Sequence, residues 1–162
     1  VTPFYGHFGV YIKALAYMLR LGGKGLGKAS DYAVLNANYI RKRIEDYIEI
    51  PYPQICMHEF VASAVTTEAQ GVKALDIAKA LLDKGYHAPT IYFPLIVKEC
   101  LMFEPTETES KETLDAFCDD LIDILKEAEK NPEALRAAPV NLPVRRLDET
   151  KAAREMVLKD DI

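Results

Sequence analysis

The chain is poor in the residues that build metal sites and disulfide frameworks. It has three cysteines and three histidines among 162 residues. The cysteines, Cys56, Cys100 and Cys118, are widely spaced and flanked by apolar residues, which argues against disulfide pairing and against a zinc site. The histidines form no HxxxH or HExxH pattern, so the sequence gives no support for a bound metal. This cysteine usage predicts a reducing, cytoplasmic location.

Patterns typical of membrane spans and nucleic-acid binding are also missing. No apolar run approaches the ~20 residues that cross a bilayer, and no basic segment followed by an apolar one marks a signal peptide. The formal net charge is -5, whereas nucleic-acid binding needs concentrated lysine and arginine. The one dense basic run, Arg41-Lys42-Arg43, is typical of a solvated helix end. We therefore expect neither a membrane nor a nucleic acid as partner.

The sequence contains the pattern of one α+β domain. Of its residues 49% are apolar and 28% charged, as in an ordinary globular domain. We expect two N-terminal helices, then a small, mostly antiparallel sheet of about three strands with helices on one face. Gly22 and Gly23 are expected to separate the first two helices, and Gly85 to follow the third as its C′ residue. Apolar periodicity places helices at residues 8–21, 26–47, 72–84 and 111–129, and strands at residues 56–64, 90–93 and 100–104.

The first predicted helix, residues 8–21, is apolar nearly all round. Such a helix is buried or covered by another domain. Tyr5, Gly6 and His7 stand at its entrance. Gly6 would allow close approach of the backbone, and free N–H groups there could bind an anion. A glycine turn that leads into a helix explains the same residues, so both interpretations stay open.

Beyond residue 131 the helical pattern dissolves among prolines. A tail of this type is either disordered or an extended arm that lies on a neighbour, and its apolar residues favour the arm. We predict a small domain at residues 1–131 and an extended C-terminal arm at residues 132–162. The chain starts at Val1 rather than methionine, which indicates a piece of a longer polypeptide.

Two histidines lie close to predicted element ends or on strands. His58 and Glu59 are neighbours on a predicted strand, so their side chains would point to opposite faces and could not form a local acid–base pair. His87 follows the predicted end of a helix, where an imidazole can cap the last carbonyl groups. Both positions have a structural explanation of this kind.

A group of carboxylates lies between the last strand and the last helix. Glu104, Glu107 and Glu109 form a cluster that could carry acid–base chemistry. Helix-start chemistry explains much of it, because Ser110 suits an N-cap and Thr106 with Glu109 would form an alternative capping box. Acidic residues also suit the positive end of a helix dipole.

Several segments in order resemble one enzyme family over essentially the whole chain. They are FYGHFGVYIKALAY, LNANY, CMHEFV, GVKALDIAK, LLDKGYHAPTIYFP and LMFEPTETESKETLDAFCD. Their combination resembles the C-terminal region of glycine dehydrogenase (decarboxylating), the P-protein of the glycine cleavage system. The ending PVRRLDETKAAR resembles subunit 2 of the two-subunit form.

The resemblance implies the small C-terminal domain of a fold type I enzyme that uses pyridoxal phosphate (PLP). Such an enzyme decarboxylates glycine and transfers the aminomethyl group to the lipoyl arm of the H-protein, and the cofactor serves as electron sink. Implied partners are P-protein subunit 1, the N-terminal part of subunit 2, the lipoylated H-protein and the substrate glycine. The family's PLP lysine follows a histidine, and no lysine here directly follows any histidine. The resemblance therefore assigns no catalytic residue to this chain, and we expect it to be inactive alone, without bound PLP.

Motif matching gives a set of residues that would form one wall of the active site. They are Tyr5, Gly6, His7, His58, Glu59, His87, Thr90, Glu104, Thr106 and Glu107.

Two other functions fit the residues. The first is a free-standing α+β binding or regulatory domain that recruits a partner through the apolar first helix and the tail. The second is an autonomous acid–base enzyme that uses Glu104 and Glu107.

Overall fold

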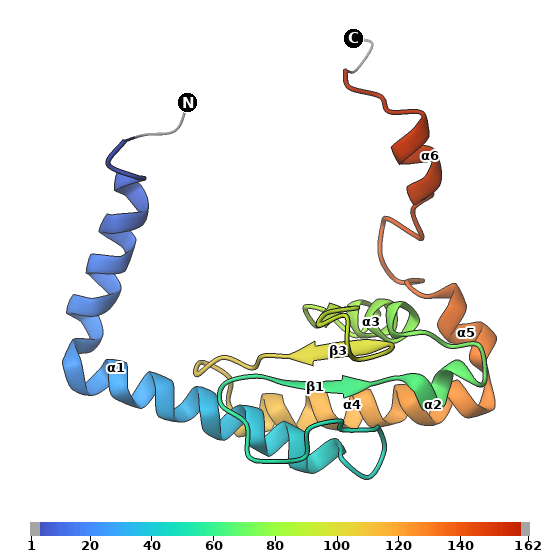
Figure 1. The fold of residues 1–162 in the computed structure, drawn as a ribbon, viewed down its shortest axis with the longest axis horizontal. Coiled ribbons are helices and arrows are strands. Elements are labelled where there is room, and N and C mark those ends of the chain that lie inside the picture. Colours follow the sequence, from blue (N-terminus) through green and yellow to red (C-terminus); the bar gives the residue numbers. More distant parts are fainter. Residues whose placement is uncertain (1–3, 160–162) are drawn as a thin grey trace.

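The computed structural model describes residues 4–159. Residues 1–3 of the predicted domain and residues 160–162 of the predicted arm therefore lie outside the described residues. The described part alternates helices with a small sheet (Figure 1). Its elements are α1 Phe8–Ile44, β1 Phe60–Ser63, α2 Val65–Glu68, α3 Ala74–Asp83, β2 Thr90–Ile91, β3 Cys100–Phe103, α4 Lys111–Lys130, α5 Pro132–Ala137 and α6 Glu149–Arg154.

The sheet is antiparallel throughout, with the strand order β1-β3-β2. Phe60 of β1 pairs with Phe103 of β3, and Ala62 pairs with Leu101. Because side chains alternate along a strand, these four residues share one face. All four belong to the buried core that α1, α3 and α4 complete. The predicted α+β fold, three antiparallel strands with helices on one face, is confirmed.

The ends of two helices follow the predicted chemistry. The Ser110 hydroxyl accepts a hydrogen bond from the Thr113 N–H (3.2 Å), so Ser110 is the N-cap of α4. Gly85 follows α3 with a φ of 88°, a left-handed conformation that favours glycine. The N–H groups of Gly85 and Tyr86 donate to the carbonyls of Leu82 and Leu81. Backbone groups thus satisfy carbonyls at this helix end, where capping was the structural explanation offered for His87.

The first two predicted helices join into α1, which bends at Gly22. This residue leaves the helical conformation (φ 64°, ψ 178°), as predicted, but the helix resumes at once and no linker separates the halves. We call residues 8–21 the outer half and residues 23–44 the inner half of α1. The inner half ends at Ile44, three residues before the predicted end at Tyr47.

Strand β1 starts at Phe60, four residues later than predicted. The reason is a long-range contact, because the Asn38 side chain of α1 binds both backbone groups of Cys56. Its amide oxygen accepts from the Cys56 N–H (3.0 Å), and its amide nitrogen donates to the Cys56 carbonyl (2.7 Å). A backbone satisfied by a side chain no longer needs strand pairing.

Part of the basic run at the end of α1 is buried rather than solvated. Arg41 is 8% exposed and donates from Nη1 to the carbonyl of Pro53 (2.7 Å). Arg43 reaches Asp115 and Asp119 of α4 (3.0 and 2.6 Å). Our interpretation of this run as a solvated helix end holds only for Lys42; the two arginines fasten α1 to its neighbours.

Strand β2 is also shorter than the four residues predicted, because it ends at Ile91. The next residue, Tyr92, has a φ of 59°, which takes the chain out of the extended conformation. The division of the chain at residue 131 stays a prediction. Beyond it, α5 packs into the core through Leu135, which is buried.

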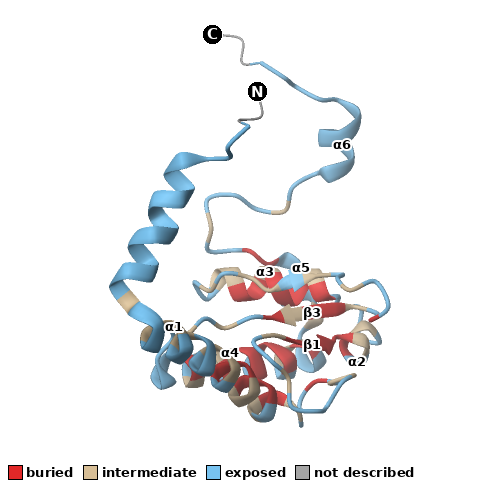
Figure 2. Cartoon of the chain, turned by 60° about the vertical axis from the view of Figure 1, so that its left-hand side comes forward, coloured by how far each residue is buried: buried red, intermediate tan, exposed pale blue. Residues whose placement is uncertain are grey.

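The two ends of the described chain stand away from the core on the same side of the sheet (Figures 1 and 2). Every residue of the outer half of α1 before Leu21 is exposed, and Figure 2 draws it in pale blue up to the bend. Its exposed side chains include large apolar ones such as Phe8, Tyr11 and Leu19. The C-terminal segment, residues 142–159, also exposes large apolar residues, among them Leu147 and Val157. Across residues 4–159, none of the helices combines the length and apolar character needed to span a bilayer.

Candidate functional site

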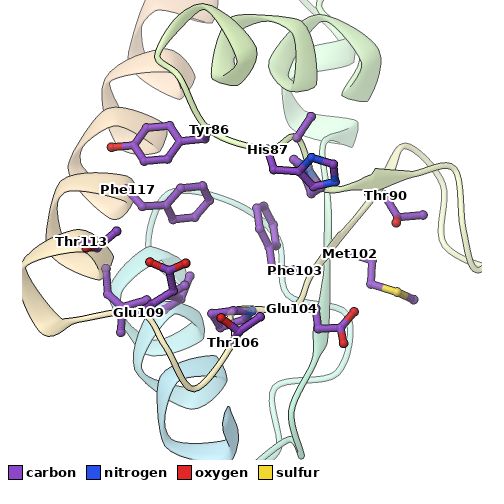
Figure 3. Close-up of a pocket in the computed structure, with 15 residues that line it drawn as sticks. Tyr86, His87, Thr90, Met102, Phe103, Glu104, Thr106, Glu109, Thr113 and Phe117 are labelled. Carbon is purple, nitrogen blue, oxygen red and sulfur yellow. The ribbon is translucent and has the colours of Figure 1, made fainter. Parts of the chain in front are cut away.

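A pocket lies where β2, β3 and the start of α4 meet. It has a volume of about 360 Å³. Figure 3 shows its polar groups on two sides, with Glu109 and Thr113 near α4, and His87 and Thr90 near β2. The lining residues are Ile40, Tyr86, His87, Ala88, Pro89, Thr90, Met102, Phe103, Glu104, Pro105, Thr106, Glu109, Thr113, Leu114 and Phe117.

An aromatic row forms the inner side of the pocket. The ring centroids of Phe103 and Phe117 are 5.9 Å apart, and those of Tyr86 and Phe117 are 5.2 Å apart, both in edge-to-face arrangements. Phe60 stacks on Phe103 from the neighbouring strand (5.3 Å). Edge-to-face and offset pairs are the favoured geometries of aromatic rings. The row gives the pocket a firm apolar floor beneath its polar rim.

The Tyr86 hydroxyl is held by a carboxylate. It donates to Asp120 Oδ2 (2.8 Å), and Lys84 Nζ lies 2.9 Å from the other oxygen of Asp120. Burial, together with this hydrogen bond to an anion, raises the pKa of Tyr86 to about 12. Burial of Asp120 opposes its ionisation, but the hydrogen bonds from Lys84 and Tyr86 outweigh this and lower the pKa of its carboxyl group. Tyr86 is therefore a neutral donor with a fixed orientation.

We expect Tyr86 to ionise near pH 12 in the folded chain, against about 10 when unfolded. Because the folded pKa is the higher one, Tyr86 stabilises the fold fully below pH 10, and this contribution disappears as the pH rises to 12. The tyrosinate absorbance titration of Tyr86→Phe should lack a step near pH 12 that the wild type has. The same titration of both chains unfolded in urea gives the reference pKa of the tyrosines. If the step that folded Tyr86→Phe lacks lies near pH 10 instead of pH 12, the expectation is contradicted.

Four of the residues predicted for the active-site wall line this one pocket. They are His87, Thr90, Glu104 and Thr106. Sequence reasoning missed the aromatic contribution of Tyr86 and Phe103. Tyr86 directly precedes His87 in the sequence, so the prediction of His87 as a wall residue could have indicated Tyr86 as well. Glu109, which the sequence analysis placed in the carboxylate cluster but not among the wall residues, also lines the pocket.

His58 and Glu59 form a local pair after all, contrary to the prediction from strand alternation. Both lie before the start of β1, so alternation does not apply to them. His58 Nε2 lies 4.0 Å from Glu59 Oε2 and 4.0 Å from Glu104 Oε1. Through Glu104, which lines the pocket, His58 adjoins the pocket.

The remaining predicted wall residues lie apart from the pocket lining. Tyr5, Gly6 and His7 precede the outer half of α1, which projects from the domain. His7 is the N-cap of α1 and accepts from the Val10 N–H through Nδ1 (3.4 Å). Glu107 accepts a hydrogen bond from the Tyr17 hydroxyl (2.9 Å) instead of lining the pocket. Of the two carboxylates that the acid–base hypothesis combines, Glu104 lines this pocket and Glu107 does not.

The pocket by itself does not fit PLP. No lysine or arginine is among its lining residues, so it offers neither an amine for an imine nor a cation for the phosphate group. The carboxylates of Glu104 and Glu109 would repel that phosphate. For metals the result is similar, since residues 4–159 hold no group of three or more His, Cys, Asp or Glu side chains placed to bind one.

An antiparallel sheet backed by helices, with a polar pocket over an aromatic floor at its edge, defines a small α+β domain. Residues 29–142 match the family described as glycine dehydrogenase, C-terminal domain. This match covers most of the sequence, and the chain belongs to that family.

Curated relatives agree with the family match. The chain is 58% identical over 159 residues to the probable glycine dehydrogenase (decarboxylating) subunit 2 of Staphylococcus saprophyticus, covering 98% of this chain and 32% of the relative. It is 58% identical over 156 residues to the protein of that name from Desulforamulus reducens, covering 96% and 32%. The relative of that name from Oceanobacillus iheyensis is 57% identical over 159 residues, covering 98% and 33%. The chain thus spans about a third of the length of these relatives.

Proposed function

We propose that the chain acts as the C-terminal part of a PLP-dependent glycine decarboxylase. The complete protein would decarboxylate glycine and transfer the aminomethyl group to the lipoyl arm of the H-protein, as an oxidoreductase component of the glycine cleavage system. The observation that carries the proposal is that His87, Thr90, Glu104 and Thr106, from two motifs of the family, line one pocket. Fold alone would not identify the activity.

In this proposal the chain supplies one wall of the active site, and the cofactor site lies in another part of the protein. The aromatic floor would exclude water from the reacting groups, which strengthens electrostatic interactions there. His87 and Thr90 would offer hydrogen bonds at the rim, while Glu104 offers a negative charge suited to a cationic amino group. When bound elsewhere in the protein, PLP would supply the electron sink for decarboxylation.

The proposal also names partners. The exposed apolar outer half of α1 and the C-terminal segment suit contact with the remaining two thirds of subunit 2 and with subunit 1. The lipoylated H-protein would approach the completed active site, and a cytoplasmic location fits the cysteine usage.

Reconstitution tests the proposal. The isolated chain should release no carbon dioxide from carboxyl-labelled glycine, and full-length subunit 2 combined with subunit 1, PLP and H-protein should release it. Thr90→Val in the full-length protein should lower kcat/KM for glycine roughly tenfold, because it removes one hydrogen bond to the substrate site. The matched substitution at the exposed Thr66 should leave kcat/KM unchanged. A specific lysine–PLP adduct trapped on the isolated chain by borohydride would contradict the proposal.

The exposed outer half of α1 also favours a second candidate function, a free-standing binding or regulatory domain. That function requires the chain to remain a folded monomer that binds neither subunit 1 nor the remainder of subunit 2. Analytical ultracentrifugation of the chain mixed with each of these proteins discriminates the two functions.

A further inference from the structure

A single hydrogen bond connects the projecting outer half of α1 to the loop at the pocket. The Tyr17 hydroxyl donates to Glu107 Oε1 over 2.9 Å. Among residues 4–159, no other side-chain hydrogen bond or salt bridge links residues 8–21 to the body of the domain. Glu107 belongs to the loop of residues 104–110, which joins β3 to α4 and contributes Glu104, Thr106 and Glu109 to the pocket.

The inner half of α1 holds the same loop from the other side of the bend. Asn36, which is 8% exposed, donates from Nδ2 to the carbonyl oxygen of Thr106 (2.9 Å). The hydroxyls of Thr106 and Thr108 share a further hydrogen bond of 2.7 Å. Both halves of one bent helix therefore bind one pocket loop, Asn36 through a buried contact and Tyr17 through an exposed one.

Side chains pack little around the bend at Gly22, although Leu21 of the outer half lies against Gly25 of the inner half. An added Cβ at Gly22 would meet no atom within 4 Å, so no neighbouring group packs against that position. Its positive φ is a conformation that glycine reaches at little cost. Tyr17 provides the side-chain hydrogen bond between the outer half and the pocket loop.

Water weakens the Tyr17–Glu107 bond in the isolated chain, since both groups lie at the surface. A partner that covers the apolar outer half would remove this water and strengthen the bond, because hydrogen bonds gain in a low-dielectric environment. The bond to the Glu107 carboxylate already raises the pKa of the Tyr17 hydroxyl. Docking at the outer half and the position of the loop are in this way physically connected.

We propose that Tyr17 is a positioning residue, which places the pocket loop of residues 104–110 through Glu107 when the outer half of α1 docks onto the rest of the protein. This role rests on the proposed function, because it assumes that the pocket is an active-site wall. Tyr17 itself stays outside the pocket and acts through Glu107.

Removal of one hydroxyl tests the proposal in two settings. In the isolated chain, Tyr17→Phe should speed hydrogen–deuterium exchange of residues 104–110 about two- to threefold, which corresponds to the low end of the net worth of one hydrogen bond because water weakens this exposed one. Tyr11→Phe, on the same exposed half, is the matched control and should leave this exchange unchanged. Glu107→Gln keeps an oxygen acceptor and should preserve the wild-type exchange, whereas Glu107→Leu should reproduce the effect of Tyr17→Phe.

In the assembled protein, Tyr17→Phe should raise KM for glycine about fivefold and change kcat less than about twofold, because the loop is displaced while the reacting groups are intact. Unchanged exchange in the isolated chain would overturn the proposal, and so would unchanged KM in an assembly where Thr90→Val is impaired. If exchange responds to Tyr17→Phe while neither variant changes glycine turnover, the connection between helix and loop stands and the proposed function fails.

Discussion

Leu121→Ala should lower the free energy of unfolding by about 3 kcal/mol, within the range of about 2–5 kcal/mol for leucine removed from a closely packed core. Leu121 of α4 is fully buried and belongs to the same cluster as Leu101 of β3 and Leu81 of α3. This cluster joins the sheet to α1, α3 and α4. The substitution removes apolar contact and leaves a cavity that these surroundings can only partly fill. Urea unfolding followed by circular dichroism measures the change, and Tm should fall by roughly 6–12 °C for a domain of this size.

The control is the same substitution on the outer half of α1. Leu19 is 75% exposed, so Leu19→Ala should stay within about 0.5 kcal/mol of the wild type. Comparable losses in the two variants would show that the outer half packs against the core, contrary to the structure. A loss below about 1 kcal/mol for Leu121→Ala would contradict the packing of α4 against the sheet.

Sequence patterns predicted the elements whose signals are local. The stripe of apolar residues in α4 and the serine at its start lie close together in the chain, and α4 follows its predicted range almost residue for residue. Strand β1 was placed too early because Asn38, far back in α1, satisfies the backbone of Cys56. A single-sequence pattern carries no sign of such a contact.

In the candidate site, too, the residues with local sequence signals were predicted and those that depend on long-range contacts were not. The polar residues at element ends, such as His87 and Glu104, were predicted because they stand where loops meet the sheet. The aromatic floor was not, because Phe117 also fits the apolar stripe of a helix, and its contact with Tyr86 exists only once α3 and α4 pack together. The partnership of Tyr17 with Glu107 spans 90 residues and has no local signature at all.

The carboxylate of Asp76 accepts hydrogen bonds both at the beginning of α3 and from Arg146, near the start of the C-terminal segment. Asp76 is 7% exposed, and its Oδ2 accepts from the Lys73 N–H (2.8 Å) at the beginning of the helix. Its Oδ1 accepts from Arg146 Nη2 (2.8 Å). Arg146 also donates to the carbonyls of Leu135 and Ala138. These bonds fasten the chain that follows α5 against α3.

Asp76→Ala should therefore cost about 2–3 kcal/mol of unfolding free energy, because two donors in a mostly buried place lose a charged acceptor. Asp31→Ala, at an exposed position of α1, is the matched control and should change stability by less than about 0.5 kcal/mol.

Arg146→Met should cost about 1 kcal/mol and speed amide exchange in residues 138–147, since the helix cap remains while the segment loses its anchor. In a double-mutant cycle, Asp76→Ala combined with Arg146→Met should cost about 1 kcal/mol less than the sum of the single losses. The Asp83 carboxylate, which accepts from the Val140 and Asn141 N–H groups (2.6 and 2.8 Å), remains as a further contact in both variants. Strict additivity of the two losses would mean that Asp76 and Arg146 act independently, contrary to the hydrogen bond between them.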